Sequence, residues 1–313
     1  MKKKAIIISI KSFYLNKNKK KILSYNPWGL ILFKRNIKSL KQIKKLIQDI
    51  KKTTNDKNFP IIIDEEGGTV SRLKKLIKHN LDQRSIGELF KVDQELAQKI
   101  YKDYIFDLCI QFKKIGININ TVPVLDVIRK NTHKVIGNRS FSNDPKTVKI
   151  LGKLCVNYYR NNKIGTIIKH IPGHGCSSSD SHFYLPRVNK SIQELNKIDF
   201  FPFKSNSCKL AMTAHILYSK IDSKNVTTFS KKVIQKVIRK KIGFKGILIS
   251  DDISMKALKY GLLKNAKKAL SAGCNLVLYC SGHYKDLNKL IKNVPYIDKF
   301  TKKKTSEFYK ILS

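Results

Sequence analysis

The sequence predicts an α/β fold and, within that class, a single (β/α)8 TIM barrel. Eight short apolar segments rich in β-branched residues alternate with longer segments whose apolar residues recur at helical spacing. This alternation is typical of a parallel sheet wrapped by helices. The chain has 313 residues, 42% of them hydrophobic, and such barrels commonly occupy about 250 residues as one domain. A doubly wound open sheet would show the same periodicity, but eight strand and helix units favour closure.

The predicted strands are the eight apolar segments, residues 5–10, 29–33, 60–63, 117–124, 165–169, 209–215, 246–250 and 275–280. One predicted helix has an apolar face of Leu40, Ile43, Leu46, Ile47 and Ile50. Another, with Val233, Ile234, Val237 and Ile238 on one face, begins after Ser230 as N-cap and ends before Gly243. The lysine-rich segments 17–21 and 302–304 are interpreted as exposed loop or terminal surface. No repeat or linker divides the chain, so residues 1–313 are predicted to form one domain.

Net charge is the extreme feature of the composition. Lysine and arginine number 64 against 22 acidic residues, which gives a net charge of +42. Basic surfaces attract phosphate backbones and raise a nucleic-acid-binding hypothesis. The lysines, however, recur on the polar faces of nearly every predicted helix, and no zinc-finger spacing, RNP-like strand or basic-region heptad accompanies them. We therefore expect a solvated, lysine-biased surface and no nucleic-acid partner.

Cysteine usage and hydropathy bear on the compartment. The six cysteines are scattered and form no C-x-x-C pair, which indicates reduced thiols. The apolar residues 5–10 are interrupted by Lys11 and fall short of the ~7 to 15 residues of a signal-peptide core. No segment reaches the ~18 apolar residues of a membrane span. We expect a cytoplasmic protein without membrane association, acting as a monomer.

The carboxyl ends of the predicted strands are unusually polar. A barrel builds its active site from these ends and the loops after them. Charged groups gathered at one rim would be costly unless a polar ligand or partner charges used them. One such strand end could be merely solvated, but five together predict a binding site. These ends carry Asp64, Glu65 and Glu66, then Asp126, Lys169 and His170, His215, and Asp251 and Asp252.

Titratable groups are densest in residues 169–182. One proline and two glycines within residues 172–175 exclude a helix and predict a loop. Asp180 precedes His182 by two residues, so its carboxylate could orient the imidazole for proton transfer near neutral pH. Purely structural histidines are one alternative, and a hydrolytic metal held by His170, His174, Asp180 and His182 is another. The H-x3-H spacing does not lie on a helix, and no cysteine or carboxylate spacing completes a metal site. We therefore expect no metal and no cofactor.

Asp251 follows the apolar residues 246–250, which predicts its carboxylate at the barrel mouth. A fixed carboxylate facing a proton donor is the arrangement that glycosidases use. Asp252 competes for this role, although the N-cap of a helix starting at Ile253 suits Asp252 better than Asp251.

Several motifs resemble, in order and spacing, those of glycoside hydrolase family 3, and most of all its single-domain bacterial β-N-acetylhexosaminidases. The likeness extends from about Gly29 to Cys280, and motifs kept in register over this length are highly specific. The motifs are G-L-I-L-F-K-R-N at 29–36, D-E-E-G-G-T-V-S-R at 64–72, V-I-G-N-R-S-F at 135–141, K-H-I-P-G-H-G at 169–175, D-S-H at 180–182, M-T-A-H at 212–215 and G-F-K-G-I-L-I-S-D-D-I-S-M at 243–255, with residues 118–127 also matching.

The resemblance implies a retaining exo-β-N-acetylglucosaminidase that releases a terminal β-linked N-acetylglucosamine, from cytoplasmic muropeptides in peptidoglycan recycling. Asp251 matches the family's nucleophile, and His182 matches its acid/base, oriented by Asp180. The sugar-binding roles carry over onto Asp64, Arg72, Arg139, Lys169 and His170.

Two alternatives stand beside this interpretation. Some relatives with a histidine acid/base transfer the sugar to phosphate, so a phosphorylase would use the same residues. A basic nucleic-acid-binding protein that has kept a barrel but lost catalysis is the other. Two positions also depart from the family pattern, because Glu65 replaces the usual Gln and Thr69 an Arg often found there. We expect these to leave one more negative and one fewer positive charge on the rim near Asp64.

Overall fold

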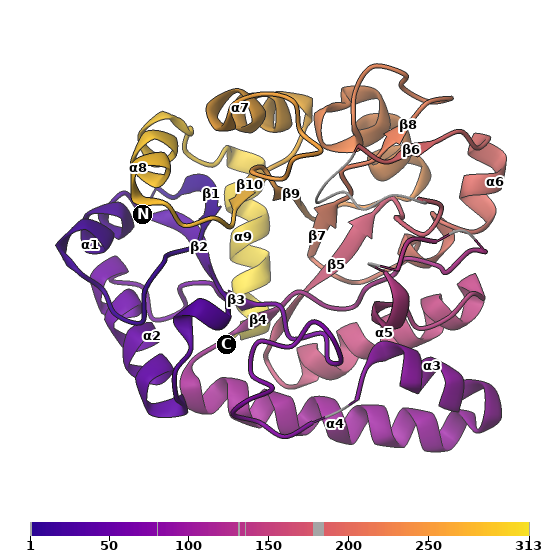
Figure 1. The fold of residues 1–313 in the computed structure, drawn as a ribbon, viewed down its shortest axis with the longest axis horizontal. Coiled ribbons are helices and arrows are strands. Elements are labelled where there is room, and N and C mark those ends of the chain that lie inside the picture. Colours follow the sequence, from indigo (N-terminus) through magenta and orange to yellow (C-terminus); the bar gives the residue numbers. More distant parts are fainter. Residues whose placement is uncertain (1, 80, 131, 135, 178–184, 313) are drawn as a thin grey trace.

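The chain forms a closed barrel of eight parallel strands in a computed structural model that describes residues 2–79, 81–130, 132–134, 136–177 and 185–312 (Figure 1). Its strands, in chain order, are β1 (Lys4–Ile8), β2 (Pro27–Leu32), β3 (Ile61–Ile63), β4 (Ile119–Asn120), β5 (Gly165–Ile171), β7 (Leu210–Thr213), β9 (Ile247–Asp252) and β10 (Leu276–Tyr279). Parallel pairing of β1 with β10, in which Ile7 lies opposite Leu278, closes the ring. The predicted barrel and its eight strands are confirmed, and the open sheet is excluded.

Helices surround this barrel in Figure 1. They are α1 (Lys17–Ser24), α2 (Leu40–Thr54), α3 (Gln83–Val92), α4 (Gln94–Ile115), α5 (Pro145–Asn161), α6 (Ile192–Lys197), α7 (Leu262–Ala272), α8 (Tyr284–Asn293) and α9 (Lys299–Leu312), with a π-helix at Val233–Lys241. Short 3-10 turns lie at Lys34–Asn36, Gly137–Arg139, Phe201–Phe203 and Thr227–Phe229. Outside the barrel, β6 (Arg187–Val188) pairs with β8 (Leu217–Tyr218). Among the helices of the described ranges, none has the length and apolar character that crossing a membrane requires.

The two helices predicted from periodicity form as the sequence indicates. In α2 the face of Ile43, Leu46, Ile47 and Ile50 is buried, and Ser39 caps the helix by accepting from the amide of Gln42 at 3.2 Å. In the second helix Ser230 is the predicted cap, because its hydroxyl accepts from the amide of Val233 at 3.0 Å. That helix has π rather than α hydrogen bonding, which the spacing of its apolar residues did not distinguish.

The two lysine-rich segments were predicted as exposed loop or terminal surface; their exposure is confirmed, but both are helical, so the loop was wrong. Residues 17–21 begin helix α1, which Asn16 caps and which buries Ile22 and Leu23. Residues 302–304 lie within α9, which buries Phe308. Lysine is a good helix former, so a run of lysines beside a few apolar residues is compatible with an exposed helix face.

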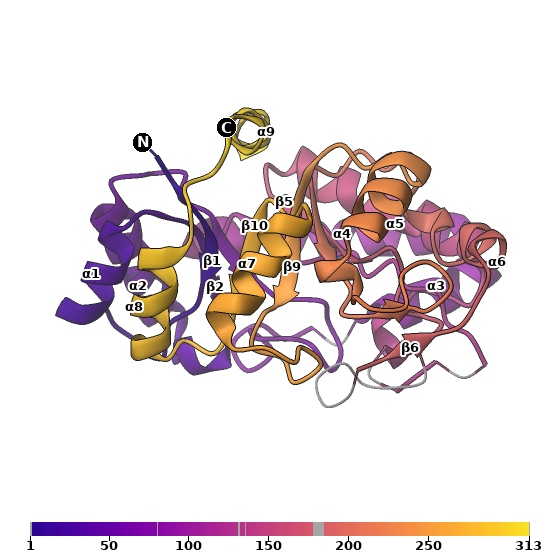
Figure 2. The same ribbon diagram turned by 90° about the horizontal axis from the view of Figure 1, so that it is seen from above.

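Helix α9 covers the amino end of the barrel. It crosses the ring in Figure 1 and lies on the same side as the marked termini in Figure 2. Trp28 of β2 donates from its indole nitrogen to the hydroxyl of Thr305 at 2.9 Å, and its ring lies 6.2 Å from that of Phe308. A side chain on Gly165, at the start of β5, would lie 2.4 Å from the Phe308 ring. The opposite, carboxyl end of the barrel is left for the site.

Candidate active site

A cavity of about 590 Å³ opens at the carboxyl ends of the barrel strands. Its lining combines charged groups with apolar surface from residues such as Phe33, Met212 and Met255. The structure brings into this lining every predicted site residue that it describes, namely Asp64, Arg72, Arg139, Lys169, His170 and Asp251. Asp180 and His182, predicted as the acid/base pair, lie outside the described residues.

Asp64 follows β3 and is held as a carboxylate. Arg72 Nη2 lies 2.9 Å from its Oδ2, Lys169 Nζ lies 3.4 Å from its Oδ1, and the Thr121 hydroxyl donates to Oδ1. Burial raises the pKa of Asp64, but the charges of Lys169 and Arg72 outweigh burial and bring the pKa well below its usual range. At neutral pH the cavity therefore contains a fixed anionic acceptor here.

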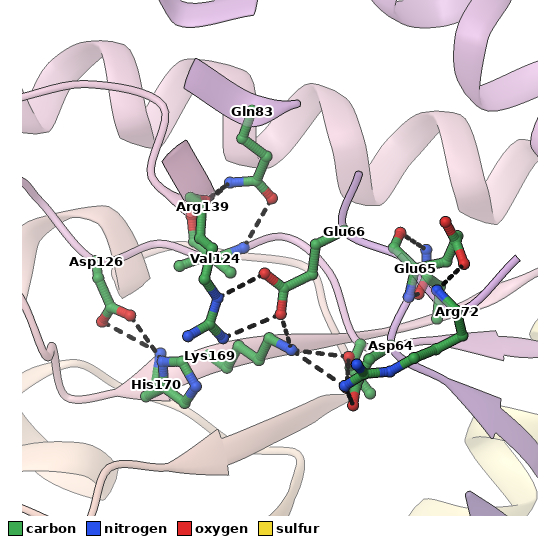
Figure 3. Close-up of polar contacts among 12 residues, drawn as sticks. Asp64, Glu65, Glu66, Arg72, Gln83, Val124, Asp126, Arg139, Lys169 and His170 are labelled. Atoms are coloured by element: carbon green, nitrogen blue, oxygen red, sulfur yellow. Dashed lines mark hydrogen bonds and ion pairs between the residues drawn. The ribbon is translucent and has the colours of Figure 1, made fainter. Parts of the chain in front are cut away.

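Glu66 lines the cavity; it was noted at a strand end but not selected as a site residue. Lys169 Nζ lies 2.5 Å from its Oε1, and Arg139 Nε lies 2.7 Å from its Oε2. Figure 3 shows Lys169 between Glu66 and Asp64, with Arg139 on the other side of Glu66. Burial raises the pKa of Glu66, and the charges of Arg139 and Lys169 reverse this, so the pKa lies below its usual value. The Glu66 carboxylate thereby holds Lys169 and Arg139 in place in the cavity lining.

His170 is oriented by Asp126, which was noted at a strand end but not selected as a site residue. Asp126 Oδ2 lies 2.7 Å from His170 Nδ1, and its Oδ1 accepts from the backbone amides of His170 and His174. Burial raises the pKa of Asp126, but its contacts with His170 and then His174 lower it below the usual value. An ionised Asp126 makes Nδ1 a donor, which leaves His170 Nε2 for the cavity.

Asp251 and Asp252 end β9, and both line the cavity. Asp251 Oδ1 accepts from the amide of Asp252 at 2.7 Å. Asp252 is tied to its surroundings, since it accepts from the amide and hydroxyl of Ser254 and from the amide of Cys280. The predicted helix at Ile253 does not form, so Asp252 caps a turn instead. Asp252 is therefore held in place at the end of β9 by its neighbours.

The carboxylates that follow β3 and end β9 all influence the pKa of one thiol, that of Cys280. Burial raises the pKa of Cys280 well above its usual range, and the negative charges of Asp252, Asp64 and Asp251 raise it further. Cys280 itself lines the cavity at the end of β10. Asp64 after β3 and the two aspartates that end β9 thus line the same cavity from opposite sides of the barrel.

Glu65 does not line the cavity, so the expectation of one more negative charge on the rim near Asp64 was wrong. Its carboxylate is fully buried and accepts from the hydroxyl of Ser71 and from the amides of Arg72 and Leu73. Successive side chains of an extended segment point to opposite sides. Asp64 and Glu66 thus face the cavity, whereas Glu65 faces the protein. Thr69, the other departure, does line the cavity.

The polar residue predicted at the end of β7 also lies outside the cavity lining. His215 is buried, with its Nδ1 2.7 Å from the Thr228 hydroxyl and its Nε2 3.0 Å from the carbonyl oxygen of Asp252. It supports β9 and is not in the cavity lining. Gln83 of α3 is a further support that no motif indicated, because its side chain bonds to the backbone of Val124 and Arg139. Only the three-dimensional neighbourhood distinguishes such supports from lining residues.

The arrangement suits a polar, uncharged ligand with several hydroxyl groups. Fixed carboxylates accept hydrogen bonds, Lys169, Arg72 and Arg139 donate them, and the apolar lining can cover a ring face. Asp251 supplies a carboxylate at the mouth. Within the parts of the chain that are described, no three His, Cys, Asp or Glu side chains are grouped to hold a metal ion.

Comparison with known proteins places this site in a family. The model of the glycosyl hydrolase family 3 N-terminal domain matches residues 3–304. A β-hexosaminidase of Neisseria gonorrhoeae is 31% identical over 283 residues, which are 88% of this chain and 78% of that protein. A β-hexosaminidase of Shewanella frigidimarina is 32% identical over 259 residues, 81% of this chain and 74% of that protein.

Solved structures agree with the sequence comparison. The structure of NagZ from Neisseria gonorrhoeae in complex with N-trifluoroacetyl-D-glucosamine superimposes with a TM-score of 0.88 and 28% identity, over 98% of this chain and 90% of that one. From the sequence alone, the carboxylates at the barrel mouth had already predicted a glycoside hydrolase. The chain therefore belongs to glycosyl hydrolase family 3.

Proposed function

We propose that the protein is a retaining exo-β-N-acetylglucosaminidase that releases a terminal β-linked N-acetylglucosamine. The observation that carries the proposal is the cavity itself, in which Asp251 at the end of β9 faces the set of Asp64, Arg72, Lys169 and His170. The β-hexosaminidase relatives support the choice of sugar.

The proposed reaction has two steps. Asp251 attacks the anomeric carbon while His182, oriented by Asp180, protonates the departing glycosidic oxygen, which forms a glycosyl ester and breaks the bond to the leaving group. His182 then takes a proton from water, and that water attacks the anomeric carbon and releases Asp251 and the sugar with its β configuration retained.

The remaining cavity groups would bind and orient the sugar. Asp64 can accept from sugar hydroxyls, while Lys169, Arg72 and Arg139 donate to them. The bond from the Asp252 amide to Asp251 Oδ1 at 2.7 Å keeps that carboxylate in place. An immobile nucleophile needs little reorganisation at the moment of reaction.

The decisive experiment is turnover of an aryl β-N-acetylglucosaminide and labelling by a fluorinated sugar. We expect the wild-type protein to hydrolyse the substrate and to be labelled at Asp251. Asp251→Ala should remove labelling and lower kcat by at least about 10³-fold. His182→Ala should spare substrates with a good leaving group and lose those with a poor one. Labelling that moves to Asp252, or a product of inverted configuration, would contradict the mechanism.

The proposal extends to the natural substrate and to the acceptor. As the family resemblance implies, the sugar would come from cytoplasmic muropeptides. We also propose that the protein acts as a monomer. Comparing kcat/KM on a muropeptide with that on a chitin disaccharide tests the substrate. Repeating the assay with and without phosphate tests the acceptor, because a phosphorylase would yield the sugar phosphate.

A further inference from the structure

Glu65 is a buried carboxylate beside the cavity that the proposed reaction does not use. It lies between Asp64 and Glu66, both of which line the cavity, yet its own side chain is turned away from them and is fully buried. Its backbone is also fixed, because Asn120 of β4 accepts from its amide at 3.0 Å and donates to its carbonyl oxygen at 2.8 Å. A buried charge in this position needs compensation by specific partners.

The partners of the carboxylate lie on the returning part of the same loop. Its Oε2 accepts from the amides of Arg72 and Leu73, each at 2.8 Å, and its Oε1 accepts from the Ser71 hydroxyl. The carboxylate therefore binds the loop segment 71–73 against the end of β3. Hydrogen bonds from backbone amides to a charged acceptor are among the stronger ones in proteins.

The loop reverses direction between these two points. Gly67 and Gly68 have positive φ values of 90° and 56°, and the amide of Glu66 bonds to the carbonyl oxygen of Val70 at 2.8 Å. The return segment delivers Arg72, whose Nη2 lies 2.9 Å from Asp64 Oδ2. The guanidinium thus reaches the cavity from a backbone position that Glu65 holds.

A histidine and a tyrosine lie behind the carboxylate. His79 Nε2 is 3.0 Å from Glu65 Oε1, within ion-pair distance although not aligned as a hydrogen bond. His79 Nδ1 lies 3.3 Å from the Tyr104 hydroxyl of α4. Neither residue lines the active-site cavity; both line a separate cavity of about 270 Å³ on the outer side of this loop. His79 therefore meets the loop through Glu65 and does not itself line the active-site cavity.

We propose that Glu65 is a positioning residue that keeps the Arg72 guanidinium beside the Asp64 carboxylate, and that His79 is the partner that holds the Glu65 carboxylate. The effect on substrate rests on the proposed function, because Arg72 is assigned there to the sugar. The placement of residues 71–73 does not rest on it. A glutamine at this position could still accept from both amides through its one carbonyl oxygen, so acceptor geometry is the essential property.

The experiment combines amide hydrogen exchange with steady-state kinetics. In Glu65→Ala the amides of Arg72 and Leu73 should exchange at least about tenfold faster, because they lose their acceptor. KM for the aryl β-N-acetylglucosaminide should rise about tenfold, with a smaller change in kcat. Glu65→Gln should restore most of both properties. His79→Phe, which keeps an aromatic ring, should raise KM by about two- to threefold.

Asp93→Ala provides the control. Asp93 caps α4 through the amide of Leu96 at 2.9 Å and lies outside the loop that Glu65 holds. This variant should lose thermal stability and keep the wild-type KM. Unchanged exchange at residues 72 and 73 in Glu65→Ala would overturn the inference, as would an equal rise of KM in Asp93→Ala. If Glu65→Ala does not fold, Ser71→Ala and His79→Phe are measured in its place, and a wild-type KM and exchange in both would overturn it.

The two proposals can fail separately. If the wild-type protein does not act on β-N-acetylglucosaminides, the proposed function fails, and amide exchange in Glu65→Ala still decides whether Glu65 places the loop. If the wild-type protein is active and Glu65→Ala equals it in KM and exchange, only the positioning role fails.

Discussion

The ammonium group of Lys169 lies 2.5 Å from the carboxylate of Glu66, and the side chains of both residues are almost completely buried. The same ammonium lies 3.4 Å from Asp64 and donates to the Thr121 hydroxyl at 2.8 Å. One cation from β5 thus compensates two carboxylates that follow β3. Its removal would leave these carboxylates close together with only the arginines to balance them.

Lys169→Met should therefore reduce stability as well as activity. Breaking a buried ion pair by removing one partner costs about 3–5 kcal/mol, because a buried charge is left uncompensated. Urea unfolding at pH 7 should show a loss of this order, and kcat/KM should fall with it. Lys41→Met, an exposed position on α2, is the control and should match the wild type. A Lys169→Met protein with wild-type stability would contradict the role assigned to this cation.

The depressed carboxyl pKa values predict a specific response to acid. The pKa values of Asp64 and Glu66 lie below their usual range, so the unfolded chain binds protons more readily than the folded one. Their contribution to stability is complete above the unfolded pKa values of about 4 and is lost as pH falls through the folded values. Glu66→Gln should flatten the fall in the free energy of unfolding below about pH 4, whereas Asp107→Asn, at an exposed site on α4, should not.

His174 should remain neutral down to acidic pH. Burial lowers the pKa of His174 to about 4, although Asp126 opposes this. Because the folded pKa is below that of the unfolded chain, the stability from neutral His174 is complete above about pH 6.5 and is lost as pH falls toward the folded value. NMR titration should show no His174 transition between pH 5 and 8, and His174→Gln should weaken the pH dependence of unfolding below pH 6.5. A transition near pH 6.5 would contradict this environment.

Asp126→Ala should destabilise the protein by about 2–4 kcal/mol, because the His170 ring and two backbone amides lose their acceptor together. KM should rise as well, since His170 loses its orientation. Asp126→Asn keeps one carbonyl oxygen and should fall between the wild type and alanine. Asp144→Ala, which removes the α5 cap through Thr147, should cost about 1 kcal/mol and leave KM unchanged. Equal effects at both positions would indicate that Asp126 is merely structural.

A substitution at Gly87 would show how closely α3 packs against the segment that contains Phe141. A Cβ at Gly87 would lie 1.8 Å from the carbonyl oxygen of Phe141, and this backbone atom cannot move without its segment. Gly87→Ala should cost about 1–3 kcal/mol by thermal unfolding. Gly261→Ala, where a Cβ meets nothing within 4 Å and φ is −67°, should stay within about 0.5 kcal/mol of the wild type.

The sequence predicted the barrel and most of the cavity for one physical reason. Parallel strands bring their carboxyl ends to one rim, so polar residues after successive strands must lie close together whatever the loops do. Asp64, Lys169, His170 and Asp251 were found in this way. Arg72 and Arg139 came from the family motifs, because they lie in loops whose paths periodicity does not fix.

Other features needed coordinates. Three consecutive acidic residues follow β3, and the sequence does not tell which of them faces the cavity. Glu65 faces away from the cavity toward His79, and Glu66 is the one that meets Lys169. The support of His170 by Asp126 joins residues 44 positions apart. The π hydrogen bonding of Val233–Lys241 depends on backbone detail that the spacing of apolar residues shares with an α-helix.

The contact of α9 with the amino end of the barrel has a consequence for biosynthesis. Trp28 and Gly165 are made well before the residues that cover them, Thr305 and Phe308. The ring itself also waits for β10 to meet β1. A nascent chain shorter than about residue 308 therefore has no α9 to cover the Trp28 indole and the start of β5, and both are exposed to solvent until that helix is made.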